Sequence, residues 1–166
     1  MFTKILVAVS ANSADIVLAS AIEAARKHDA QIVALHVIDP RHCYLRGVDC
    51  NYGLIVDEMK AHGRTVVTHV RNVLASQTHP AEVRMLTLPT SGMTMGAAIA
   101  SVADETGADL ILLGQRSAFR WRWLSEDVAL DVVRCSSKPI QIAADRTDMR
   151  SSRRAGARCV DVSAVR

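Results

Sequence analysis

The sequence predicts an α/β protein: an open, parallel, five-stranded sheet in a three-layer, Rossmann-like fold with helices on both faces. Short apolar runs alternate along the chain with longer segments in which apolar residues recur at helical spacing. Strands that alternate with helices are joined by right-handed crossovers, which makes the sheet parallel and covers both of its faces. The composition agrees, because aromatic residues form only 4% of the chain and aliphatic residues are left to fill the core.

Five apolar runs predict the strands. The second run is ended by the Asp39-Pro40 pair and the third by Pro89, because proline has no N–H to donate to a strand ladder. In chain order, the predicted strands are Lys4–Val9, Gln31–Ile38, Val83–Leu88, Leu110–Leu113 and Ile140–Ala143.

Four segments with helical spacing predict the helices. Ser13 is the expected N-cap of the first, Gly107 is the expected C-cap of the third, and the fourth opens near Ser125. Gly63, inside the second, lowers helix stability by about 1 kcal/mol relative to alanine. The predicted helices are Ser13–His28, Gly53–Ser76, Met95–Thr106 and Leu124–Cys135. The residues expected to face inward are, helix by helix, Ile16, Ala19, Ile22 and Ala25; Ile55, Met59, Val66, Val70, Val73 and Leu74; Ile99, Val102 and Ala103; and Leu124, Val128, Val132 and Cys135.

The 166 residues are expected to form one domain over residues 1–144, followed by a basic tail over residues 145–166. The tail holds six arginines and three aspartates, which accounts for the whole formal charge of +3. It has no sustained period, so we expect it to be poorly ordered. A neutral domain argues against a nucleic-acid surface on the fold itself.

The sequence also bears on the cellular compartment. No apolar run approaches the roughly 20 residues of a membrane helix, and Met1–Ser10 lacks the pattern of a signal peptide. We therefore expect a cytoplasmic protein that does not bind a membrane. The cysteines show no CxxC pairing and are expected to be reduced thiols; they are Cys43, Cys50, Cys135 and Cys159.

The stretch from Ala108 to Ala143 has the local order of a phosphate-binding unit. A buried strand ends at Gly114, a polar loop follows, and a helix then opens. Unpaired N–H groups at such a helix N-terminus attract anions. In open α/β sheets, ligands lie outside the carboxyl ends of the strands. Those ends are predicted at Ser10–Asn12, Val37–Asp39, Pro89–Gly92 and Gly114–Ser117.

Four segments together resemble the universal stress protein family: KILVAVS, ALHVID, GADLILLGQR and DVVRCSSKPIQIA. They occur in order and at fitting spacing over Thr3–Ala144. The resemblance implies an adenine nucleotide alpha hydrolase-like fold and a small cytoplasmic dimer that is induced under stress. Many members of this family bind ATP, so the residues at the family's nucleotide positions are informative.

The ATP-binding members have an Asp at the end of the first strand and a Val near the end of the second. Gly-x-x-Gly and then Gly-Ser or Gly-Thr follow the fourth strand. By the resemblance, these positions fall on Ser10, Val37, Gly114 with Ser117, and Glu126 with Asp127. A side chain in place of glycine obstructs a phosphate, and two carboxylates repel it. We therefore expect a degenerate nucleotide site, with the helix N-terminus satisfied by its own carboxylates and no cofactor.

The alternative is a nucleotide-binding protein that holds ATP with magnesium and has weak ATPase activity. A rearranged pocket would then be built from the residues around the predicted loop. These residues are Ser10, Val37, Gly114, Arg116, Ser117 and Ser125.

Two features predict contacts with partners. Trp121 and Trp123, each preceded by an arginine, form either a contact patch for an unidentified protein or a loop anchor in which one ring packs inward. The resemblance also implies a homodimer in which the last strand pairs edge to edge through Ile140 and Ile142. The basic tail is a further candidate for partner contact.

Neither a metal site nor an active site is expected. His62 and His69 lie seven residues apart, which is too far for a shared metal on one helix. Ser10, Ser117 and Ser125 have no His and acid that the sequence places beside them. The expected function is therefore that of a non-enzymatic stress-response or regulatory protein.

Overall fold

The computed structural model describes residues 1–41, 52–89, 92–114 and 127–143. The predicted tail lies outside the described residues. The strands are β1 (Lys4–Ala8), β2 (Gln31–Ile38), β3 (Ala81–Thr87), β4 (Leu110–Gly114) and β5 (Ile140–Ala143). They form one parallel sheet in the order β3-β2-β1-β4-β5, which confirms the predicted fold class.

The strand bounds agree closely with the prediction. β2 and β5 begin and end where predicted, whereas β3 starts at Ala81 and β4 continues to Gly114. β1 ends at Ala8, although the N–H of Val9 still donates to the carbonyl of Leu35, at 2.9 Å.

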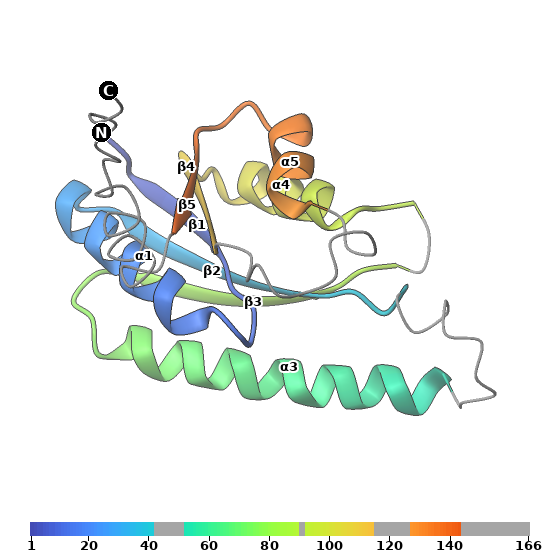
Figure 1. Ribbon diagram of the computed structural model, residues 1–166. Coiled ribbons are helices and arrows are strands. Elements are labelled where there is room, and N and C mark those ends of the chain that lie inside the picture. The colour runs from blue at the N-terminus through green and yellow to red at the C-terminus, as the bar shows by residue number, and fades with distance from the viewer. Residues whose placement is uncertain (42–51, 90–91, 115–126, 144–166) are drawn as a thin grey trace, which may run out of the picture.

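In the described part of the chain, four helices cover the two faces of the sheet. They are α1 (Ala14–His28), α3 (Tyr52–Ala75), α4 (Met95–Thr106) and α5 (Val128–Cys135). In Figure 1, α1 and α3 lie on one face, and α4 and α5 lie on the other. The described part of the last helix begins at Val128 with Asp127 as its N-cap, and the predicted start near Leu124 and Ser125 lies outside the described residues. None of the described helices combines the length and hydropathy of a membrane span.

The core has two parts, one on each face of the sheet. Successive residues of β1 point to opposite faces. Ile5 and Val7 therefore pack with α1 and α3, whereas Leu6 packs with α4 and α5. All three side chains are completely buried, so the central strand contributes to both parts of the core.

The predicted inward face of α1 was wrong in part, because Ile22 and Ala25 pack toward the core but Ile16 and Ala19 do not. Ile16 and Ala19 are exposed, and Ala25 is the only predicted member that is fully buried. Residues spaced strictly by three drift around a helix by about 60° per step, because a turn takes 3.6 residues. The observed stripe mixes spacings of three and four and stays on one side; it consists of Ala14, Val17, Leu18, Ala21 and Ala25.

The remaining helix predictions were partly right. The inward residues of α4 are buried as predicted, and so is Val132 in α5. Cys135 was expected to face inward, but it is exposed, because this short helix turns only one fully buried position to the core. Ser13 stands at the N-cap of α1, yet its side chain makes no capping hydrogen bond.

Gly63 has a packing role that its low helix propensity conceals. A Cβ at this position would lie 2.8 Å from Cδ1 of Ile38 and 3.1 Å from Sδ of Met85. The missing side chain thus lets α3 approach β2 and β3 closely. Glycine lowers the intrinsic stability of the helix, but it allows α3 to pack tightly on the sheet.

Candidate functional site

The carboxyl ends of β1 and β4 meet the first turn of α1. Ser10 is exposed, and its hydroxyl lies 2.8 Å from the hydroxyl of Ser13. The N–H of Ser13 also donates to the carbonyl of Ser10, at 3.2 Å. Ser13 therefore turns its side chain toward Ser10 instead of capping its own helix.

Gly114 lies against the same turn. A Cβ at Gly114 would be 2.7 Å from Cγ2 of Val17 and 2.8 Å from Oγ of Ser13. The structure thus brings Gly114 and Ser10 to one place, as the sequence predicts. It also gives the glycine a packing role, because any side chain there would displace α1 from the end of β4.

Val37 lies near the end of the neighbouring strand, half-buried on the face that α4 and α5 cover. The adjacent His36 binds β2 to the end of β1, with Nδ1 at 2.9 Å from the carbonyl oxygen of Val9. Ser10 and Val37 therefore occupy adjacent strand ends. The other residues predicted for this site, Arg116, Ser117, Ser125 and Glu126, lie outside the described residues.

Helix α5 begins with a carboxylate on its own N–H groups. Asp127 has an extended backbone (φ −74°, ψ 90°), and its side chain accepts a hydrogen bond from the N–H of Leu130 at 3.2 Å. This is the geometry of an N-cap aspartate. A group that helix N-termini otherwise offer to anions is therefore already satisfied.

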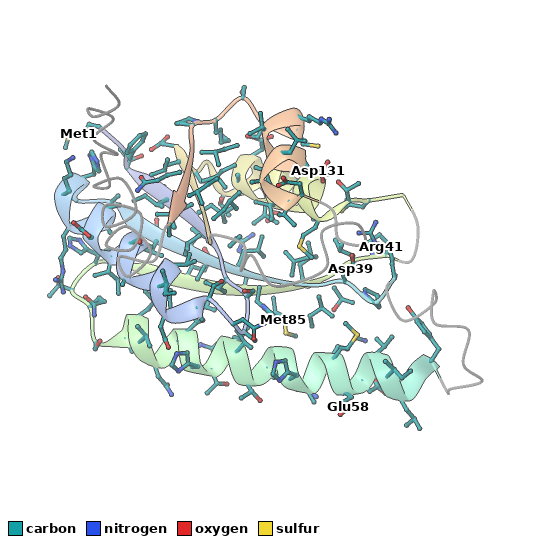
Figure 2. All side chains as sticks on the ribbon, viewed as in Figure 1. Met1, Asp39, Arg41, Glu58, Met85 and Asp131 are labelled. Carbon is teal, nitrogen blue, oxygen red and sulfur yellow. The ribbon has the colours of Figure 1, made fainter. Side chains whose placement is uncertain are left out.

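The N-terminus of α4 is filled in a similar way. Thr94 caps it by accepting from the N–H of Ala97 at 3.1 Å. Asp131 reaches across from the first turn of α5, and its carboxylate accepts the N–H of Gly96 at 2.9 Å (Figure 2). A Cβ on Gly96 would lie 2.7 Å from the backbone carbonyl carbon of Asp131, so only glycine permits this approach.

The role of Asp131 was missed by sequence reasoning. The residue lies 35 positions from Gly96, and no spacing rule links one helix start to another. The one sign of this contact in the sequence was Gly96, a glycine in the first turn of a predicted helix. Together, Asp127 and Asp131 place two carboxylates at the start of α5. A carboxylate of the chain stabilises the helix N-terminus beside which it lies. The same negative charge repels an incoming phosphate.

No group of three or more His, Cys, Asp or Glu side chains that could hold a metal ion occurs among the described residues. His69 pairs instead with Asp15, with Nε2 at 2.7 Å from the carboxylate, and joins α3 to α1.

The last strand leaves apolar surface at the edge of the sheet. Ile140 packs against the core, whereas 53% of Ile142 is exposed. The predicted contact residues Trp121 and Trp123 lie outside the described residues.

Comparison with known proteins identifies the class to which this fold and site belong. The model of the universal stress protein family matches residues 1–143, so the chain belongs to the universal stress protein family. No curated protein sequence matches it significantly.

Solved structures of this family are similar in fold. A universal stress family protein from Burkholderia pseudomallei is 21% identical, with a TM-score of 0.67, over 86% of this chain and 96% of that one. The Archaeoglobus fulgidus protein in complex with dAMP is 23% identical, with a TM-score of 0.59, over 86% and 98%. A universal stress protein in complex with cAMP is 20% identical, with a TM-score of 0.60, over 86% and 97%.

Proposed function

We propose that this protein is a non-enzymatic, regulatory member of its family whose nucleotide site does not accept a triphosphate. One observation carries the proposal: the carboxylate of Asp127 accepts the N–H of Leu130 at the start of α5. The phosphates of a nucleotide would need the same groups. They would also meet a negative charge, and like charges 4 Å apart repel by about 1 kcal/mol in water and about 4 kcal/mol near a protein surface.

Calorimetric titration with Mg-ATP tests this proposal. We expect no saturable binding with a Kd below about 100 μM, which corresponds to roughly −5.5 kcal/mol. Tighter binding by the unmodified protein would contradict the proposal.

A second candidate is the binding of a nucleotide with fewer phosphates. It is supported by the solved structures of relatives with dAMP and with cAMP. A monophosphate carries less charge toward Asp127 and Asp131 than ATP does. Titration with dAMP and cAMP beside Mg-ATP separates the two candidates, because binding of only the monophosphates would favour this one. The pocket would again use Ser10, Val37 and Gly114.

We also propose that the protein is a homodimer joined through β5. The two edges of the sheet differ in chemistry. On β3, Arg84 pairs with Glu82 at 2.6 Å and with Glu105 of α4 at 2.7 Å, and such charges discourage strand pairing. On β5, the exposed Ile142 offers apolar surface.

Sedimentation at micromolar concentration tests the dimer. Ile142→Lys is expected to weaken association at least about tenfold, or 1.4 kcal/mol. Met85→Lys, on the opposite edge strand, is the matched control and is expected to leave association unchanged. A monomeric unmodified protein, or equal effects of the two substitutions, would contradict the proposed interface.

A further inference from the structure

A hollow of about 350 Å³ lies between the end of β2 and the N-terminal half of α3. Its apolar walls are the side chains of Ile38, Ile55 and Met59, and Glu58 and His62, both exposed on α3, lie at its rim. The volume falls within the range of small-molecule sites. Figure 2 shows Glu58 on α3 and Asp39 at the end of β2, on either side of this region.

His36 gives the hollow a defined polar group. The residue lines the hollow and is only 8% exposed. Its Nδ1 lies 2.9 Å from the carbonyl oxygen of Val9, and a carbonyl oxygen can only accept a hydrogen bond. Nδ1 therefore carries the proton in the neutral ring, and Nε2 presents a lone pair.

That lone pair has no partner among the described residues. Nε2 is therefore not fully buried, because every fully buried side-chain nitrogen or oxygen in the described part of the chain has a hydrogen-bond partner. Since His36 lines the hollow, we infer that Nε2 faces it. An acceptor in the wall of a mostly apolar hollow favours a ligand with a donor, because a ligand without one would cover the acceptor and leave it unsatisfied.

The charges around the hollow narrow the class of ligand further. Asp39 is paired with Arg41 through two bonds, at 2.8 and 2.7 Å, and Glu58 adds an exposed carboxylate. Because Arg41 compensates the charge of Asp39, it is the carboxylate of Glu58 that disfavours an anionic ligand such as a phosphate. The apolar walls favour an uncharged ring.

We propose that this hollow binds a small, uncharged aromatic molecule that carries one N–H or O–H group, which donates to Nε2 of His36. The site lies on the side of β2 that α3 covers. Val37 also lines the hollow, although it packs toward α4 and α5, so the hollow borders one residue of the proposed nucleotide pocket. The proposed contact with His36 uses neither Ser10 nor Gly114.

Two probes test the proposal on the unmodified protein. Indole carries the ring N–H, and benzofuran has nearly the same shape without a donor. We expect indole to bind with a Kd below about 1 mM, followed by NMR shifts of the methyl groups of Ile38, Ile55 and Met59. Benzofuran should bind about tenfold more weakly. No saturable indole binding up to about 1 mM, equal affinities, or shifts elsewhere would overturn the proposal.

Three variants test the role of each part. Ile55→Trp fills the hollow and is expected to abolish indole binding, whereas Leu54→Trp is the control, because Leu54 is 67% exposed and does not line the hollow. His36→Asn keeps a donor for Val9 and removes Nε2. It should make indole and benzofuran bind equally; a remaining preference for indole would overturn the assigned acceptor.

Discussion

The N-termini of α4 and α5 and the hollow beside β2 differ in whether the chain satisfies its own polar groups. At the helix starts, Asp127 and Asp131 accept N–H groups that a ligand would otherwise use. In the hollow, Nε2 of His36 has no partner among the described residues. The chain's own carboxylates thus occupy N–H groups in the first region, whereas the second region presents an acceptor to which the proposed ligand would donate.

Glycine contributes to both regions in opposite ways. Gly96 lets α5 approach α4 until the backbone of Asp131 occupies the space of a side chain. Gly63 lets α3 approach β2 and β3 until the flexible ends of Ile38 and Met85 are the nearest atoms. At Gly96, the space of a side chain is filled by backbone atoms, which cannot move aside. At Gly63, the nearest atoms are ends of side chains, which can move aside.

The largest expected effect separates these two glycines. Gly96→Ala should lower the free energy of unfolding by about 2–3 kcal/mol, because the added methyl group meets backbone. Gly63→Ala should stay within about 1 kcal/mol of the unmodified protein, because the ends of Ile38 and Met85 can move and alanine is the better helix former by about 1 kcal/mol. Urea unfolding of both variants measures the difference. Equal losses in the free energy of unfolding would show that the contacts at Gly96 and Gly63 do not differ in rigidity.

A smaller effect is expected at Asp131, whose side chain joins α5 to the N-terminus of α4. Asp131→Ala leaves the N–H of Gly96 without its acceptor and should lower the free energy of unfolding by about 1–2 kcal/mol. Asp131→Asn retains a carbonyl oxygen at the same place and should recover about half of that loss. Thermal unfolding measured by circular dichroism compares the two. If alanine is no worse than asparagine, the bond to Gly96 does not stabilise the protein.

The smallest effect concerns Asp109, which directly precedes β4 and lies at the amino ends of the central strands. The pKa of Asp109 lies below its ordinary value, first because the hydroxyl of Thr3 donates to it and then because the N–H of Thr3 does so at 2.7 Å. A lowered pKa in the folded state stabilises the protein above the ordinary pKa, and this contribution is lost as pH falls through the folded value.

Asp109→Asn should therefore cost about 1 kcal/mol at pH 7, and the difference from the unmodified protein should shrink below about pH 4. Urea unfolding at pH 7 and at pH 3 measures both values. A difference that grows as pH falls would contradict the assigned role of the carboxylate.

Much of the fold could be predicted because the strands are short apolar runs bounded by clear signals. Pro139 precedes β5 and Asp39-Pro40 follows β2, and both strands have their predicted bounds. Gly107 closes α4 in the left-handed conformation, as predicted. The inward face of α1 could not be read from spacing alone, because its alanines fit more than one stripe.

The site was predictable only in part. Asp127 was identified as a competitor for the helix N-terminus, because a cap lies next to its helix in sequence. Asp131 and the lone pair of His36 were not identified. Both depend on contacts between elements far apart in the chain, which are determined by packing and not by local pattern.

The charge of Asp127 is the centre of this account, and Mg-ATP titration of variants tests it most directly. Asp127→Asn keeps an N-cap side chain of equal quality, and the double variant Glu126→Gly/Asp127→Ser also restores the glycine and serine of the family pattern. We expect Mg-ATP affinity to rise about tenfold in the first and further in the second, with stability within about 0.5 kcal/mol of the unmodified protein. Unchanged affinity in both variants would contradict the claim that this carboxylate closes the site.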